Sequence, residues 1–182
     1  MEIIGTNNDI NFAVTNQFDS KYLNPIILNL LYKANNDWDD YNELYHCCQL
    51  IENINRNNNM EVDYHVMIKD KNYIGIALVS RGSIDFNSFF KQPILVSENT
   101  NEILIFNYFH ICQEGRGNGE RWLKEIIMPY YNFKKYKAIY LKSSHPKSFS
   151  LYSRLGVEIG SYENNSDNHL MSRKGKIFKI PL

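Results

Sequence analysis

Apolar residues along this chain follow two spacings, and each spacing predicts a different kind of element. They alternate with polar residues over 62–68 and over 74–78, and Asp70-Lys71-Asn72 between the two runs is typical of a tight turn. This pattern predicts a β-hairpin. Over 41–51 the apolar residues recur every three or four positions, which predicts a helix with one buried face.

The remaining pattern predicts strands that alternate with helices in the second half of the chain. The expected elements are a strand over 11–15, a helix over 24–36, a long strand over 102–111, a helix after residue 120, a strand over 136–141, a helix from His145-Pro146 to Gly156, and a hairpin of 157–162 with 170–180. A strand, a helix and a second strand in succession form a parallel βαβ step. We therefore expect one α/β domain over residues 1–182.

Composition narrows the class of protein. With 182 residues, 43% of them hydrophobic, the chain can form a packed core. Lys and Arg number 20, as do Asp and Glu, so bulk charge does not indicate a nucleic-acid or membrane partner. The cysteines number 3, two of them adjacent, which favours reduced thiols and a cytoplasmic protein. No signal peptide, membrane span or metal-ligand spacing is expected from the pattern.

Residues 113–123 carry the strongest candidate for a binding site. They read Gln-Glu-Gly-Arg-Gly-Asn-Gly-Glu-Arg-Trp-Leu, between the long predicted strand and a predicted helix. Glycines at such a junction let the backbone approach a ligand, and the start of the helix presents unpaired N–H groups to an anion. We interpret this segment as a phosphate-binding turn.

Two common phosphate-binding patterns do not fit this turn. A dinucleotide fingerprint needs G-x-G-x-x-G, but the sixth position counted from Gly115 is Glu120. A P-loop needs Gly-Lys-Ser/Thr after its first glycines, and that sequence does not follow here.

The segment 114–119 resembles a motif of the GNAT superfamily, the acyl-CoA-dependent N-acyltransferases, with the pattern Gln/Arg-x-x-Gly-x-Gly/Ala. Glu114 stands where the family has Gln or Arg. A second family motif is similar to residues 145–157, where Leu151-Tyr152 and Gly156 are intact. The departures in this second motif are His145, Ser148 and Val157.

The resemblance implies a mixed central sheet whose fourth and fifth strands splay apart, with helices on both sides. Acetyl-CoA would be the co-substrate, without a metal. Its pantetheine arm would pair with backbone groups of Phe109 and Ile111 on the long strand. Its pyrophosphate would lie on the N–H groups of Gly115, Arg116, Gly117, Asn118, Gly119 and Glu120.

The resemblance also implies direct transfer of an acetyl group to a primary amine. Tyr152 would be the acid that assists the leaving thiolate, with a core tyrosine as the alternative. For the base, the family suggests Glu102 at the head of the long strand, which could equally be a solvated strand end. His110 is a rival because of its pKa range, and many relatives use water alone.

The acceptor is not identified by the sequence, and a small-molecule or a peptide amine would both fit. Asp37, Asp39, Asp40 and Glu43 lie where the family places a wall of the acceptor site, and carboxylates there would attract a cationic amine. A solvated, helix-capping charge run is the alternative. Whether the chain forms a homodimer stays open.

Two other classes of function remain possible on sequence grounds. The departures at Glu114 and His145 leave room for a non-catalytic coenzyme-A-binding regulatory module. A protein-interaction domain would use Phe86, Phe89 and Phe90, although these residues are also expected to tether the weakly patterned segment 83–100 to the core.

Overall fold

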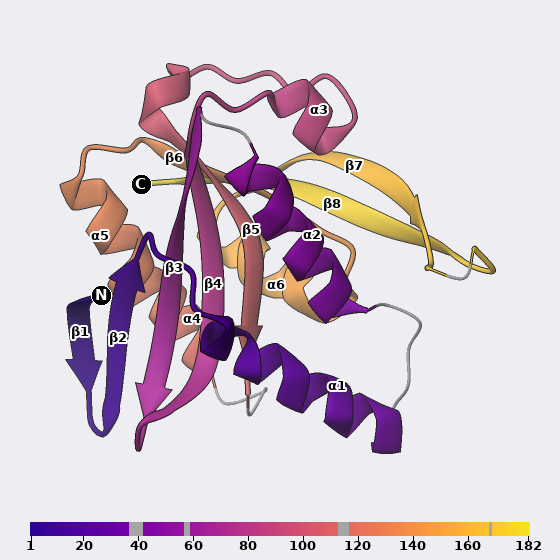
Figure 1. Ribbon diagram of the computed structural model, residues 1–182. Coiled ribbons are helices and arrows are strands. Elements are labelled where there is room, and N and C mark those ends of the chain that lie inside the picture. Colours follow the sequence, from indigo (N-terminus) through magenta and orange to yellow (C-terminus); the bar gives the residue numbers. More distant parts are fainter. Residues whose placement is uncertain (37–41, 57–58, 113–116, 168) are drawn as a thin grey trace.

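The computed structural model describes residues 1–36, 42–56, 59–112, 117–167 and 169–182. Within them, eight strands form one sheet in the order β1-β2-β3-β4-β5-β6-β8-β7 (Figure 1). The strands are β1 (Glu2–Asn7), β2 (Ile10–Thr15), β3 (Met60–Lys69), β4 (Asn72–Gly82), β5 (Ile103–Ile111), β6 (Ala138–Ser143), β7 (Val157–Asn165) and β8 (Ser172–Pro181). β5 and β6 run parallel, whereas the other described neighbours run antiparallel.

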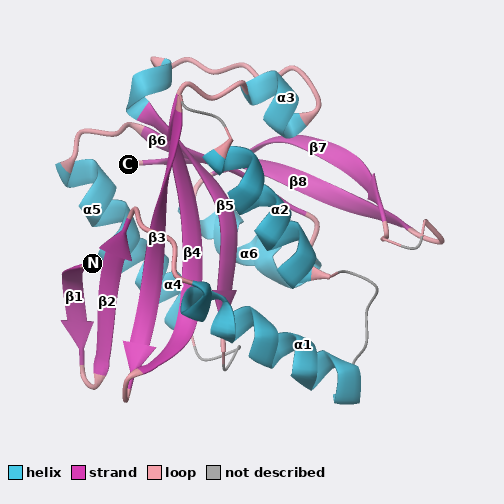
Figure 2. Ribbon diagram, viewed as in Figure 1, coloured by secondary structure: helices cyan, strands magenta, loops and turns pink. Residues whose placement is uncertain are grey.

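Helices cover both faces of the sheet (Figure 2). On one face lie α1 (Asn24–Asn36) and α2 (Glu43–Asn55), whose buried residues pack on β3 and β4. On the other face lie α4 (Asn118–Arg121), a π-helical segment over Trp122–Ile127, α5 (Met128–Phe133) and α6 (Pro146–Leu155). The short helix α3 (Phe86–Phe90) covers a third cluster near β6. No helix in the described ranges is both long enough and apolar enough to cross a membrane.

The elements predicted from the sequence correspond well to the strands and helices of the structure. The hairpin of β3 and β4 is confirmed, and its turn uses Asp70 and Lys71 at positive φ (48° and 66°), which suits a tight hairpin turn. The strand predicted over 11–15 is β2, and β1 precedes it. We missed β1 because it is a half-exposed edge strand that pairs with β2 alone and alternates weakly. The predicted fourth and fifth strands are therefore β5 and β6.

The aromatic residues of 83–100 are confirmed as a tether. Phe86 and Phe90 are buried, and the Phe86 ring packs edge-on against Tyr140 at 5.6 Å between centroids. Because Phe86 and Phe90 are buried, the structure contradicts the hypothesis that these two residues form a docking surface for a partner, whereas Phe89 is half-buried.

The predicted divergence of two neighbouring strands is confirmed between β5 and β6. Their register pairs Ile103 with Ala138 and continues to Phe106 with Leu141, where it ends. Beyond that point β5 continues to Ile111, while β6 stays paired with β8 to its end at Ser143. A gap therefore opens between the two parallel strands.

The structure shows why the second motif has a glycine at position 156. Its N–H donates to the carbonyl of Tyr152 (2.9 Å) and so ends α6. A Cβ built on this glycine would lie 2.2 Å from the carbonyl oxygen of Lys179 in β8. Only glycine lets the end of α6 approach β8 this closely.

A buried polar network joins β3 to α5. The Tyr131 hydroxyl donates to Asp63 Oδ2 (2.9 Å) and lies 2.8 Å from His65 Nε2, and Arg81 Nε donates to the same Asp63 oxygen (3.3 Å). Since the Tyr131 proton is used on Asp63, His65 Nε2 carries a proton and donates. Burial lowers the pKa of His65 to about 4, so the ring is neutral at pH 7.

Candidate active site

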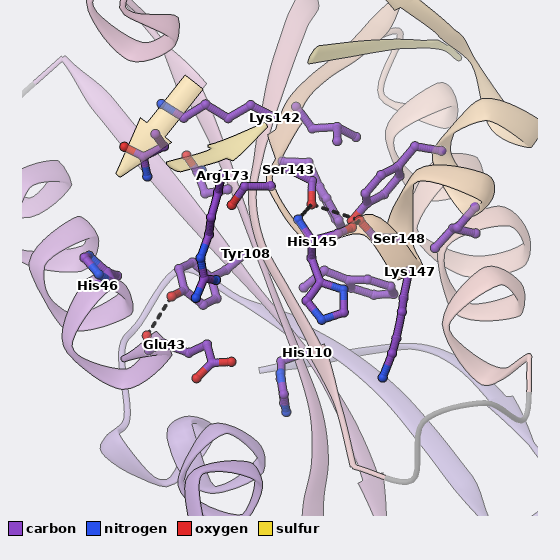
Figure 3. A pocket seen from close by; sticks show the side chains of 18 of the residues that line it. Glu43, His46, Tyr108, His110, Lys142, Ser143, His145, Lys147, Ser148 and Arg173 are labelled. Carbon is purple, nitrogen blue, oxygen red and sulfur yellow. Dashed lines mark hydrogen bonds between the residues drawn. The ribbon is translucent and has the colours of Figure 1, made fainter. Parts of the chain in front are cut away.

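A cavity of about 1120 Å³ occupies the gap between β5 and β6. Its lining comes from β5, β6, α6 and the start of α4 on one side, and from α1, α2, the segment after α3, and the β7–β8 hairpin on the other. Figure 3 shows these side chains converging from both directions. We call the part next to α4 and α6 the turn side, and the part next to α1, α2, the segment after α3 and the β7–β8 hairpin the acceptor chamber; β5 and β6 contribute side chains to both parts.

A β-bulge at Asn107 decides which side chains reach each part. Leu78 of β4 pairs with Tyr108, whereas its neighbour Val79 pairs with Phe106, so Asn107 is an extra residue in β5. The bulge reverses the alternation of side chains along the strand. Phe109 and Ile111 consequently pack on the α4 face, and Tyr108 packs on the α1–α2 face.

The backbone of Phe109 and Ile111 faces the gap. The N–H of Cys112, just after β5, donates to Ile74 O of β4 (2.8 Å). Because backbone groups alternate in direction along a strand, those of Tyr108 and His110 also face β4. Those of Phe109 and Ile111 then face the space from which β6 has diverged. Binding of a pantetheine arm by these groups stays a prediction.

The glycine turn closes one end of the cavity. Gly117 has φ +72°, caps α4 and has no atom within 4 Å of a Cβ built on it. A Cβ on Gly119 would lie 3.1 Å from the Phe109 ring and 3.3 Å from Ile111, so the helix start packs closely on β5. Asn118 lines the cavity as well. The predicted contacts of Gly115 and Arg116, and the departure at Glu114, lie outside the described residues.

Glu120, one of the residues predicted to bind the pyrophosphate, also forms an ion pair. Its carboxylate accepts two hydrogen bonds from Arg154 of α6, at 2.6 Å and 3.3 Å. The hydrogen bond from Arg154 holds the pKa of Glu120 below its usual value. This pair ties the start of α4 to the helix that carries Tyr152. Sequence reasoning missed Arg154, because it occupies an unspecified position of the second motif.

Tyr152 lines the cavity from α6, and its catalytic role stays a prediction. Its ring packs on Phe178 at 5.6 Å, and its hydroxyl makes no hydrogen bond to the described part of the chain. Burial raises the pKa of Tyr152 above its ordinary value of 10. The hydroxyl therefore keeps its proton at neutral pH, which is the form that donates.

Glu102, the predicted base, is not brought to the cavity. It belongs to a 3₁₀ turn (Thr100–Glu102) before β5, and its carboxylate accepts from Asn99 Nδ2 (3.3 Å). The paired residues Ile103–Phe106 separate it from the gap, a length of about 13 Å for a strand. The gap opens at the other end of β5, so this geometry argues against Glu102. His110, the rival, does line the cavity.

The second motif also supplies a polar rim on the turn side. Ser143 Oγ donates to Ser148 Oγ (2.8 Å), Ser148 Oγ donates to His145 O (2.8 Å), and the His145 N–H donates to Ser143 Oγ (3.2 Å). This cycle fixes the first turn of α6 on the end of β6. Figure 3 shows the imidazole of His145 and the long side chain of Lys147 directed to the cavity. Ser148 thus has a local hydrogen-bonding role here.

The acceptor chamber is built around the first turn of α2. Tyr108 donates its hydroxyl proton to the carbonyl of Glu43 (2.6 Å), which joins α2 to β5 immediately after the bulge. The Glu43 side chain forms an ion pair with Lys33 of α1. Asp167, near the tip of the β7–β8 hairpin, accepts from the Asn42 N–H and lies 2.9 Å from His46 Nε2.

Of the four acidic residues predicted to wall the acceptor site, Glu43 lines the cavity. Asp37, Asp39 and Asp40 lie outside the described residues. Within the described ranges, no three His, Cys, Asp or Glu side chains are placed to hold a metal ion.

Comparison with known proteins shows the fold. No family model matches the sequence, and a search of curated proteins finds no match. A ribosomal-protein-alanine N-acetyltransferase from Brucella melitensis superposes with a TM-score of 0.55 at 13% identity, over 93% of this chain and 99% of that one. A probable acetyltransferase from Staphylococcus epidermidis gives 0.59 at 12% identity, over 94% and 98%.

A third solved structure is a GNAT superfamily phosphinothricin acetyltransferase from Sinorhizobium meliloti in complex with acetyl-CoA. It gives a TM-score of 0.57 at 13% identity, over 94% of this chain and 88% of that one. At these identities the likeness shows the fold alone. The chain has the GNAT fold, as the two sequence motifs predicted.

Proposed function

We propose that this chain, which has the GNAT fold, transfers an acetyl group from acetyl-CoA to a primary amine by direct attack. The observation that carries the proposal is the cavity between β5 and β6. It has the start of a helix at one end, strand backbone along its wall, and Tyr152 in its lining. A fold alone hosts many functions, so the proposal rests on this arrangement.

The residues present fit the coenzyme. An extended arm with amide groups can pair with the backbone of Phe109 and Ile111, which faces the gap. The N–H groups from Gly117 to Glu120 begin a helix that continues through α5, so they can hold a pyrophosphate. The predicted contacts of Gly115 and Arg116 with the pyrophosphate belong to the same proposal. Acetyl-CoA supplies the thioester, and the chain positions it.

Tyr152 assists departure of the sulfur by a hydrogen bond. A free thiol has a pKa of about 8.5, which lies below the raised pKa of Tyr152. The phenol is therefore too weak an acid to give its proton fully to the thiolate. It stabilises the developing negative charge instead.

The amine must lose a proton before it attacks. An alkyl amine has a pKa near 10, so most of it is protonated at neutral pH. His110 and Glu43 line the cavity and Glu102 does not. We therefore assign proton acceptance to His110 or to water held beside it.

The test is turnover of acetyl-CoA with a panel of amines, followed by release of free thiol. A rate that depends on the amine and saturates with it supports the proposal. Tight binding of coenzyme A without thiol release with any amine would favour the non-catalytic regulatory module instead.

The glycine turn gives a separate prediction. Gly119→Val should raise the Kd of coenzyme A by about tenfold or more, because its side chain would push α4 away from Phe109 and Ile111. Isothermal titration measures this. Gly160→Val is the control, since a Cβ there meets Gln92 Nε2 at 3.3 Å, outside the turn. Equal Kd values for the two variants would contradict the assigned cradle.

A further inference from the structure

Among the described side chains that line the acceptor chamber, positive ones outnumber negative ones. Its described lining includes Lys33, Lys91, Lys142 and Arg173, against the carboxylates of Glu43 and Glu163. The Lys33–Glu43 ion pair is neutral as a unit. Lys142 has no carboxylate partner in the described part of the chain, so it would attract a negative group and repel an acceptor with several positive charges.

Lys142 is the cation whose environment most needs a negative partner. It follows Leu141, the last residue of β6 paired with β5, and its side chain enters the chamber. Its ammonium donates to the carbonyl of Phe89 and lies 4.6 Å from the Phe89 ring and 5.9 Å from the Tyr162 ring. Within the described ranges no carboxylate forms an ion pair with it.

The pKa of Lys142 is consistent with this geometry. Burial, with a smaller contribution from the positive charge of Lys91, lowers it to about 8. A bound carboxylate would supply the missing counter-charge and raise the pKa again. Arg173 reaches into the same chamber from β8, and Figure 3 shows its side chain extending toward Tyr108 and Glu43.

Glu43, in contrast, has one carboxylate oxygen that lacks a hydrogen-bond donor among the described residues. Its carboxylate oxygen Oε1 contacts Lys33, while Oε2 is buried and has no hydrogen-bond donor in the described part of the chain. A buried carboxylate oxygen without a donor costs free energy. The N–H groups of an amine at this point would satisfy it.

We propose that the acceptor is an amine that also carries a carboxylate, such as a free amino acid, with its amine at Glu43 and its carboxylate at Lys142 and Arg173. This inference rests on the proposed acetyl transfer, because it names the substrate of the same site. A ligand of this kind carries both an N–H donor for Glu43 Oε2 and a counter-charge for Lys142. A simple amine meets one of them, and a diamine places a second cation near Lys142.

Matched ligands test the proposal. γ-Aminobutyrate, n-butylamine and putrescine share a four-carbon chain and differ in the far group, and L-alanine with L-alaninamide tests the shortest separation. For at least one carboxylate-bearing member, kcat/KM should exceed that of its matched amine or amide by about tenfold or more. Putrescine should be the poorest of its series. Lys142→Met should remove most of the preference, and Lys137→Met, at an exposed lysine outside the cavity, should keep it.

A second measurement does not depend on turnover. In protein labelled at lysine Cε, the NMR titration midpoint of Lys142 should rise when the preferred carboxylate-bearing amine is added, and should not rise with its matched amine. If kcat/KM for putrescine or n-butylamine equals that for the carboxylate-bearing ligands, the inference is overturned while acetyl transfer stands. If no amine is acetylated, the proposed function fails. The titration then decides alone, and an unmoved Lys142 midpoint overturns the inference.

Discussion

Tyr152→Phe should lower kcat by about 10- to 100-fold and leave the Kd of acetyl-CoA nearly unchanged. The substitution removes one hydroxyl and keeps the ring that packs on Phe178. The lost interaction is a hydrogen bond to a sulfur that becomes negative only as the thioester bond breaks. An interaction present mainly in the transition state affects kcat rather than binding.

Steady-state kinetics and isothermal titration on the same preparation measure the two effects. Tyr140→Phe is the matched control, because Tyr140 is buried outside the cavity and donates to Glu98 Oε2 (2.8 Å). It should lose some stability and keep its kcat. An unchanged kcat in Tyr152→Phe would refute the proposed hydrogen bond to the sulfur and leave Tyr152 as a core residue.

Local pattern and turn chemistry were sufficient for most of the fold. Alternation identified β3 and β4, and Pro146 with Gly156 marked the two ends of α6. The strand–glycine–helix sequence predicted a phosphate-binding turn, and its described residues Gly117, Asn118 and Gly119 line the cavity. These features depend on a few adjacent residues, so they can be read along the chain.

The bulge at Asn107 could not be read in this way. The segment Ile105 to Tyr108 alternates no differently from an ordinary strand, and the extra residue is visible only against β4. Yet the bulge decides that Tyr108 faces the acceptor chamber and Phe109 the turn side. A difference of register between two strands is a property of the pair and not of either sequence.

Long-range charge contacts were missed for the same reason. Glu102 was assigned from its place at the head of a strand, but the strands diverge at the opposite end. The pairing of Glu120 with Arg154 spans two helices. Lys142 was not singled out either, because its contacts with Phe89 and Tyr162 join segments far apart in the sequence.

The largest expected effect on stability comes from His65. This residue has no exposed surface, and its pKa is about 4 in the fold against an ordinary value of 6.5. The folded state therefore binds fewer protons than the unfolded state between these values. The contribution of neutral His65 to the free energy of unfolding is fully present above pH 6.5 and is lost progressively as the pH falls toward 4. The shift corresponds to about 3 kcal/mol.

Chemical denaturation between pH 7 and pH 4 measures this loss, and His65→Gln isolates it. Glutamine can still donate to the Tyr131 hydroxyl but does not titrate, so its free energy of unfolding should decline by about 3 kcal/mol less than that of the natural chain over this range. His169→Asn, at an exposed histidine, should follow the natural chain. Carboxylates titrate in all three proteins, so the difference between curves carries the result. Parallel curves for His65→Gln and the natural chain would mean that His65 is protonated inside the fold, with Tyr131 and Asp63 rearranged to receive the charge.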